Sequence, residues 1–412
     1  EINFNSKNEL NLENISETTE NLLDWADKKL GQILISKGKL IECLSSMSQI
    51  FLQEKGDFIN IFLDLSEEEL MRQSRVVAVE KLNVFLDLSI RSSSISNSAS
   101  LLISSISFSI SPISTFELIS VLQSMNFGET TQNINNVYLP AAHSSLSSKA
   151  AYECLSLDFK PKSPLSLLLS PSSILKYQLL FRVLLVLRLG DRQLGVAWKS
   201  LQEQRDVSSL PFFKKASLML QRLSYVSRAI LSHIHMESLF PAREKLMSVL
   251  NNSITLSSAI NAHETFLEEC LKNSLLLDRR FKPILWNLAM FFLFFGENIK
   301  DLLSDYLRPD YQAIILSEIE ENNSQSLINR KSLITAHKRK MAEKLLREKK
   351  FPANLDKFWI KFKENIDELS KLLKEQSFVI HSLNQSMEMD ETADLKQLLR
   401  LAASIKPSWI VL

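Results

Sequence analysis

Glycine is scarce in this sequence, with seven glycines among 412 residues. Tight hairpins and phosphate-binding loops depend on glycine, whereas the interior of a helix tolerates it poorly. The seven glycines form neither G-x-x-x-x-G-K-[ST] nor G-x-G-x-x-G, the two patterns that bring backbone N–H groups close to a phosphate. The composition therefore predicts a mostly helical chain and argues against nucleotide binding through such a loop.

Cysteine is also rare, and the three cysteines are odd in number and far apart: Cys43, Cys154 and Cys270. No C-x-x-C pair occurs. A secreted disulfide framework needs an even, closely spaced set, so this usage predicts free thiols in a reducing compartment.

The sequence lacks an excess of charge of either sign, since its formal net charge is +1. The longest apolar run, Ile284–Phe295, is too short to cross a bilayer core of about 30 Å, and we expect a buried helix there. The basic run Lys338–Lys350 is interrupted by glutamates and has no interleaved aromatic residues, which favours a solvated helix. We therefore predict no nucleic-acid binding and no membrane insertion.

Residues that could carry catalysis are missing as well. No G-x-S-x-G occurs, and His263-Glu264 is followed by Leu267 where a zinc protease needs its second histidine. His233, His235 and Glu237 would share one face of a strand, but on the predicted helix residues two apart diverge by about 200°. We predict no catalytic site, no metal site and no cofactor, so the chain is not expected to be an enzyme.

Apolar residues recur at helical spacing through most of the chain. Ser170-Pro171 is typical of a helix start, with a capping serine and a proline in the first turn. The helix that follows, which we expect to end near Trp198, is apolar almost all round and therefore belongs inside a bundle. The other predicted helices are 22–44 with a break at Gly38, 59–70, 79–90, 115–125, 212–239, 243–250, 257–277, 283–295, 311–321, 356–383 and 392–403. The predicted fold class is all-α, with elongated helical bundles and at most a few short strands.

Two stretches depart from this helical pattern. Leu155–Pro164 alternates apolar residues and is predicted to be extended. Arg91–Ser114 is rich in serine; Ile106, Phe108 and Ile110 alternate as in a short strand, but the serine bias and Pro112 favour a loop or linker.

The residues Leu155–Trp198 carry a family resemblance. An extended lead-in with prolines is joined to a long helix that bears Lys176-Tyr177, Phe181-Arg182 and Trp198. This order resembles the second GRIP motif of γ-tubulin complex proteins. The stretch departs from the family at Ser163, where tryptophan is usual.

A second region, earlier in the chain, resembles the end of the first GRIP motif. It contains Phe51-Leu52, Gly56-Asp57-Phe58 and the glutamates Glu67–Glu69, and it leads through Leu86-Asp87-Leu88 to Arg91. The glutamates make it most similar to the component-2 type. Most of the first motif is absent. In the second region, the run NLQYY that is usual in the family is replaced by Arg228-Ala229-Ile230-Leu231-Ser232. Because the chain also begins at Glu1 rather than methionine, we expect it to be part of a longer protein.

The resemblance implies a scaffold that binds γ-tubulin and helps assemble the γ-tubulin complex for microtubule nucleation. The implied partners are γ-tubulin and other γ-tubulin complex components packed side by side. The implied location is the cytoplasm and cytoskeleton, at a microtubule organising centre or spindle pole. It divides the chain into the end of an N-terminal GRIP helical module (1–91), a serine-rich linker with a connecting helix (92–149) and a C-terminal γ-tubulin-binding helical domain (150–412).

The candidate γ-tubulin-binding residues lie along the helix of the second motif. They are Lys176, Tyr177, Phe181, Arg182, Arg188, Arg192 and Trp198. Tyr177, Phe181 and Leu184 are spaced as a single stripe, which by itself predicts core. The three arginines are the better surface candidates, because a buried and unpaired guanidinium would be costly.

Two other readings of the sequence stay open. One is another helical scaffold or a vesicle-tethering subunit that does not bind γ-tubulin, since similar leucine-rich bundles occur there. Such folds need neither the Gly56-Asp57-Phe58 turn nor the KYxxxFR pattern at 176–182, and these features favour the first reading. An enzyme is the third reading, because a partial chain can lack catalytic parts.

Overall fold

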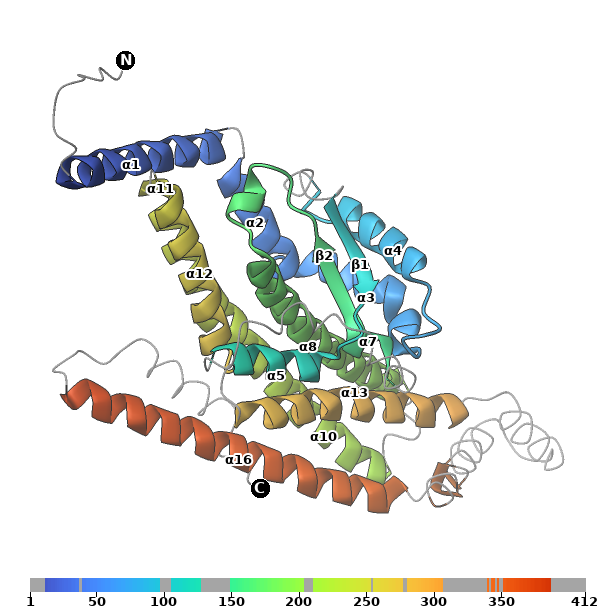
Figure 1. Ribbon diagram of the computed structural model, residues 1–412. Coiled ribbons are helices and arrows are strands. Elements are labelled where there is room, and N and C mark those ends of the chain that lie inside the picture. Colours follow the sequence, from blue (N-terminus) through green and yellow to red (C-terminus); the bar gives the residue numbers. More distant parts are fainter. Residues whose placement is uncertain are drawn as a thin grey trace, which may run out of the picture. The chain divides into compact units, whose positions relative to one another are not determined.

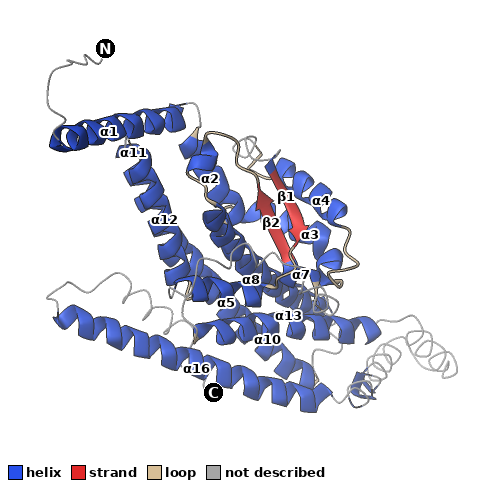
Figure 2. Ribbon diagram, viewed as in Figure 1, coloured by secondary structure: helices blue, strands red, loops and turns tan. Residues whose placement is uncertain are grey.

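The computed structural model of the chain is almost entirely helical (Figure 1). It describes residues 12–36, 39–96, 105–126, 149–203, 210–252, 255–276, 280–306, 339–340, 342–344, 347 and 351–386. Within those ranges the extended backbone is confined to one two-stranded sheet and an isolated bridge between Gln73 and Ala150 (Figure 2). The prediction of an all-α fold with few short strands is confirmed.

The helices follow the predicted periodicity closely. Their bounds are α1 Leu12–Ser36, α2 Leu40–Phe51, α3 Gly56–Met71, α4 Val79–Ser92, α5 Thr115–Asn126, α7 Ala151–Cys154, α8 Pro171–Glu203, α10 Pro211–Ser232, α11 Phe240–Asn252, α12 Leu256–Asn273, α13 Phe281–Tyr306 and α16 Phe351–Ser386. A 3₁₀ turn, η6, covers Leu165–Leu167, and a π-helix, η7, covers His233–Leu239. The predicted helices 311–321 and 392–403 lie outside the described residues, as does most of the basic run 338–350.

The predicted helix boundaries have local causes in the structure. Helix α8 begins where the Oγ of Ser170 accepts a hydrogen bond from the backbone N–H of Ser173 at 3.1 Å, with Pro171 in the first turn. The predicted break near Gly38 falls between the end of α1 at Ser36 and the start of α2 at Leu40. Both predictions are confirmed.

The chain forms two compact units. Unit 1 takes the described residues of Glu1–Ser114, Asn135–Arg182 and Ser238–Lys272, and unit 2 takes those of Thr115–Ile134, Val183–Glu237 and Asn273–Leu412. Helix α8 passes from unit 1 to unit 2 between Arg182 and Val183. The division of the chain at 91 and 149, made from sequence motifs, stays a prediction.

Unit 1 contains the two-stranded sheet, made of β1 (Ile106–Ile110) and β2 (Leu155–Phe159). The strands are antiparallel, with Ile106 opposite Phe159. The side chain of Asn83 in α4 holds the middle of β1, because its Oδ1 accepts a hydrogen bond from the backbone N–H of Phe108 at 2.6 Å. The prediction of an extended segment at 155–159 is confirmed, whereas the preference for a loop at 106–110 is wrong. Pairing with a segment about fifty residues away outweighs the local serine bias.

Unit 2 is built around α13, which packs against α10, α16 and α5. Two glycines allow its close approach to α8. A Cβ at Gly296 would lie 2.7 Å from the backbone carbonyl carbon of Gln193, and one at Gly190 would lie 2.9 Å from the Cβ of Phe292. The apolar run of α13 is largely buried, as predicted, although Phe294 is half exposed. Over the described parts of the chain, no helix combines the length and the apolar character needed to span a bilayer.

Candidate partner-binding site

Helix α8 carries all seven candidate residues, but they belong to different units. Lys176, Tyr177, Phe181 and Arg182 lie in unit 1, whereas Arg188, Arg192 and Trp198 lie in unit 2. The candidates therefore do not form one continuous patch within either unit, and each group is described within its own unit.

In unit 1, Tyr177 and Phe181 are completely buried among aromatic rings. The ring of Phe51, from α2, lies 5.7 Å from that of Tyr177 and 6.3 Å from that of Phe181, centroid to centroid. Phe108, from β1, lies 6.0 Å from Phe181 and 5.0 Å from Phe62 of α3. The core stripe predicted from the spacing is confirmed. The two regions that resemble the family also meet here, since Phe51 belongs to the first and Tyr177 to the second.

The hydroxyl group of Tyr177 shares a hydrogen bond with Nε2 of His263 in α12 at 3.1 Å. Both side chains are fully buried. Burial lowers the pKa of His263 to about 4, and the positive charge of Lys176 adds to that effect. His263 is therefore a neutral, structural residue at physiological pH, in agreement with the failed zinc-protease pattern around it.

Arg182 is the clearest correction to the sequence prediction. We expected its guanidinium at the surface, but the residue is 2% exposed. Its Nη1 donates a hydrogen bond to the backbone carbonyl of Ile113 at 2.9 Å. The charge is tolerated because a backbone acceptor just after β1 is aimed at it, a contact between residues 69 positions apart that sequence spacing cannot show.

Lys176 occupies the edge of the same unit. Its side chain is 15% exposed, and its Nζ lies 3.5 Å from the carboxylate of Glu268 in α12. With Tyr177 bonded to His263, this ion pair gives α8 a second polar contact with α12. Lys176 is thus largely engaged within the unit.

In unit 2, Arg188 is partly buried. Its Nη2 donates a hydrogen bond to Nε2 of His235 at 3.2 Å. Burial, reinforced by Arg188, lowers the pKa of His235 to about 4, so the imidazole is neutral and can accept that bond. His233, two residues earlier, instead donates from Nε2 to the backbone carbonyl of Asn273 at 3.3 Å. The two histidines of the π-helix therefore have separate structural partners.

Arg192 and Trp198 are the two candidates on the more open part of α8, and both are partly exposed. Trp198 lines a groove of about 580 Å³ between α8 and α10. Gly195 lines the same groove, and α10 contributes Tyr225 and Arg228. The α10 residues were not among those predicted from the sequence. The signal that could have found them is that the sequence of α10 contains lysines and arginines but neither aspartate nor glutamate.

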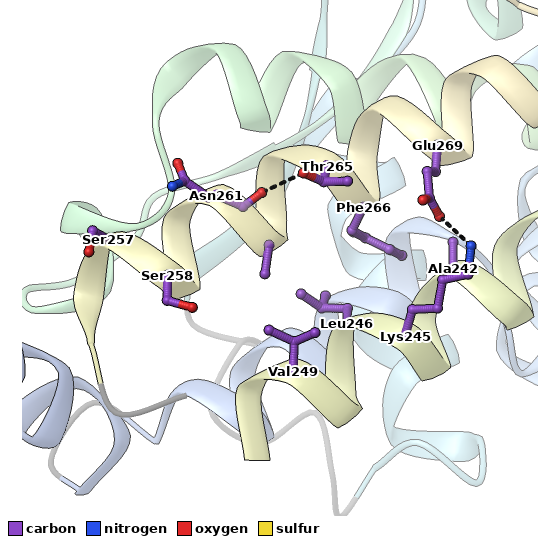
Figure 3. A pocket seen from close by; sticks show the side chains of 11 residues that line it. Ala242, Lys245, Leu246, Val249, Ser257, Ser258, Asn261, Thr265, Phe266 and Glu269 are labelled. Carbon is purple, nitrogen blue, oxygen red and sulfur yellow. Dashed lines mark hydrogen bonds and ion pairs between the residues drawn. The ribbon is translucent and has the colours of Figure 1, made fainter. Parts of the chain in front are cut away.

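A second groove lies in unit 1 between α11 and α12, with a volume of about 610 Å³ (Figure 3). Leu246, Val249 and Phe266 give it an apolar floor. At one end, the Nζ of Lys245 lies 3.2 Å from the carboxylate of Glu269. These charges neutralise each other, so this groove has no marked charge preference.

The described residues offer little for catalysis. All three cysteines are buried and none forms a disulfide. Burial raises the pKa of Cys43 to about 11 and raises that of Cys270 still further, so both thiols stay protonated at neutral pH and are poor nucleophiles. In the same part of the chain, no cluster of three or more histidine, cysteine or acidic side chains could hold a metal ion.

Comparison with known proteins assigns this architecture to a family. The family model described as gamma tubulin complex component C-terminal matches residues 40–401. The chain is 27% identical over 262 residues to gamma-tubulin complex component 2 of Mus musculus, covering 63% of this chain and 28% of that protein. It is 27% identical over 256 residues to gamma-tubulin complex component 2 of Arabidopsis thaliana, covering 62% and 35%.

A fungal relative gives a longer match. The spindle pole body component alp4 of Schizosaccharomyces pombe is 25% identical over 363 residues, covering 76% of this chain and 45% of that protein. The chain thus spans less than half the length of each of these three relatives. The sequence-based resemblance to the component-2 type is confirmed, and the chain belongs to the gamma tubulin complex component C-terminal family.

Proposed function

We propose that this chain is a structural subunit that binds γ-tubulin and helps assemble the γ-tubulin complex that nucleates microtubules. The observation that carries the proposal is the family match over residues 40–401, which covers both regions of resemblance. The names of the relatives, gamma-tubulin complex component 2 and spindle pole body component, support it. The protein acts by holding a partner and has no chemistry of its own.

Two units built of packed helices suit this role. Nucleation requires several γ-tubulin molecules at fixed spacing, and a scaffold that is already ordered does not lose that conformational entropy again when it binds. The aromatic cluster of Phe51, Phe108, Tyr177 and Phe181 fixes the first half of α8 within unit 1. In unit 2, Gly190 and Gly296 permit the tight packing of the second half of α8 against α13.

The candidate residues divide into two roles in this proposal. Tyr177, Phe181 and Arg182 are buried and position α8, whereas Arg192 and Trp198 lie in the part of α8 that includes the exposed Gly195 and Lys199, and they are the proposed contacts with γ-tubulin. Lys176 and Arg188 are partly buried in internal contacts and support their neighbours. Contact with the partner is thereby assigned to the more open, second half of α8.

The proposal extends to surroundings and other partners. The subunit packs side by side with other γ-tubulin complex components, in the cytoplasm at a microtubule organising centre or spindle pole. It neither inserts into membranes nor binds nucleic acid. The names of its spindle pole body relatives support the location.

A binding experiment with the whole 412-residue chain tests the proposal. The purified chain and purified γ-tubulin are mixed at micromolar concentration and run on a sizing column, with serum albumin replacing γ-tubulin in a parallel run as an acidic control. We expect the chain to elute early with γ-tubulin and separately from albumin. Separate elution from γ-tubulin would favour the alternative, a helical scaffold or tethering subunit that does not bind it.

A further inference from the structure

The groove between α8 and α10 in unit 2 has the build of a peptide-binding surface. Its volume of about 580 Å³ is within the usual range of about 300–1,000 Å³ for ligand sites. A Cβ placed on Gly195 would meet no atom within 4 Å, so the α8 side of the groove is open there. Trp198 and Tyr225 supply one aromatic wall from each helix.

The apolar surface continues along α10 beyond the groove. Tyr225 is 38% exposed, and Leu218, seven residues earlier and thus two helical turns away on the same face, is 48% exposed. The two residues are separated by about 10 Å along the helix axis, given a rise of 1.5 Å per residue. If a side chain of a bound partner packs beside Trp198, neighbouring residues of that partner can contact the exposed apolar surface along α10.

The charged residues that α10 brings to this groove are all positive. Helix α10 contains Lys214, Lys215, Arg222 and Arg228 and has no acidic residue. Two of these cations are engaged elsewhere in unit 2, because Lys215 pairs with Asp356 and Arg222 lies 4.9 Å from the centroid of the Trp359 ring. Lys214 and Arg228 face solvent.

Arg228 lies directly in the groove and is only loosely held. Its side chain is 72% exposed, and its Nε lies 3.7 Å from the carboxylate of Asp191, which is a long ion pair. Lys199, next to Trp198 on α8, is also exposed. The groove thus presents an exposed arginine from α10 beside two aromatic rings.

We infer that this groove receives an acidic segment of γ-tubulin that carries one large apolar side chain. The apolar side chain packs between Trp198 and Tyr225, and a carboxylate of the same segment faces Arg228. Aromatic pockets with nearby arginine are typical of the residues that dominate binding energy, and complementary charge fixes orientation and speeds association. This inference rests on the proposed function, because it names the surface through which γ-tubulin binding takes place.

Substitutions at Gln221 test the charge complementarity with a predicted sign. Gln221 lines the groove and is exposed, so Gln221→Glu and Gln221→Lys change its charge without disturbing the core. With γ-tubulin and the full chain at low salt, we expect Gln221→Glu to raise the Kd about threefold or more, which is weaker binding. We expect Gln221→Lys to lower the Kd about twofold. Raising the salt concentration should reduce the difference in Kd between the two variants, because salt screens the charges.

Trp198→Ala tests the apolar contact, with an expected loss of about tenfold or more in affinity. Trp25→Ala is the matched control, since Trp25 is 62% exposed and lies in unit 1. The affinity of Arg228→Glu for γ-tubulin is compared with that of Arg91→Glu. Arg91 is the matched control because it is also an exposed arginine paired with an aspartate, Asp87. Circular dichroism and thermal melting check that each variant is folded, and the Gln221 pair decides the matter if Trp198→Ala does not fold.

The outcomes separate this inference from the proposed function. If wild-type chain binds γ-tubulin but both Gln221 variants bind equally well, or a folded Trp198→Ala binds as well as Trp25→Ala, the groove is not the binding surface and the proposed function survives. If the wild-type chain does not bind γ-tubulin, the proposed function fails and the inference fails with it.

Discussion

The hydroxyl of Tyr177 lies 3.1 Å from Nε2 of His263, and the two rings stack with centroids 5.7 Å apart. The residues are 86 positions apart in the sequence, and both are fully buried. The bond joins α8 to α12 within unit 1 and is surrounded by apolar side chains, where an unmade hydrogen bond is costly. We therefore regard this pair as a fixed point of the helical scaffold.

The first prediction concerns this bond. Tyr177→Phe removes the hydroxyl and leaves His263 buried without that partner, while the ring packing is kept. We expect a loss of about 1–3 kcal/mol in the free energy of unfolding, measured by urea denaturation. Tyr225→Phe is the control, because Tyr225 is 38% exposed and water can reach it. Equal stability of the two variants would show that the buried bond contributes nothing.

The second prediction concerns pH. The pKa of His263 is lowered by burial from its ordinary 6.5 to about 4, so the unfolded chain takes up a proton at this position at a higher pH than the folded chain does. Its stabilising effect is fully present above about pH 6.5 and is lost as the pH falls toward 4. We expect the protonation of His263 to lower the free energy of unfolding by about 2 kcal/mol between pH 7.5 and pH 5.

Comparison with His263→Gln isolates this contribution, because His235 has a similarly lowered pKa and titrates in the same range. The carboxylate of the buried Glu69 affects the stability of the fold only at lower pH. The hydrogen bond from Lys81 lowers its pKa below 4.5, so its contribution is lost only as the pH falls below that value. If wild type and His263→Gln lose the same stability between pH 7.5 and pH 5, the neutral buried imidazole is not the cause.

The third prediction concerns Arg182. Because its guanidinium donates to the carbonyl of Ile113 inside unit 1, Arg182→Glu should destabilise the fold by about 3 kcal/mol or more rather than act only on binding. Lys199→Glu, at an exposed position on the same helix, should leave the melting temperature nearly unchanged. Thermal melting followed by circular dichroism distinguishes them. A normal melting temperature for Arg182→Glu would place that side chain at a surface after all.

The fourth prediction compares two glycines of unit 2. Gly296→Ala places a methyl group 2.7 Å from the carbonyl carbon of Gln193 and should cost about 1–3 kcal/mol. Gly195→Ala meets no atom within 4 Å and lies within α8, so it should stabilise the protein by about 0.5–1 kcal/mol. Chemical denaturation of both variants measures the difference, and the opposite order would contradict the close packing of α8 against α13.

The sequence predicted those features that depend on neighbouring residues. The start of α8 follows from Ser170-Pro171, and the buried stripe follows from the spacing of Tyr177 and Phe181, because both are set within a few helical turns. Features that depend on distant partners were missed. The strand at 106–110 exists because 155–159 pairs with it, and Arg182 is buried because Ile113 offers it a carbonyl.

The candidate site shows the same limit. The helix that carries the site could be found from its motif, but the accessible residues on it could not be separated from the buried ones. The facing wall of the groove, with Tyr225 and Arg228, comes from α10, which helical periodicity predicted only as a helix. Its one readable signal, four cations without a single carboxylate, was not used in the sequence-based prediction. Charge pattern, rather than apolar spacing, is what could have indicated this surface.

Sedimentation velocity of the full chain with γ-tubulin tests the central claim most directly. The account predicts a species that sediments faster than either protein alone, at micromolar concentration and moderate salt, and that is lost when γ-tubulin is replaced by albumin. If the two proteins sediment independently under these conditions, the chain is not a γ-tubulin-binding scaffold.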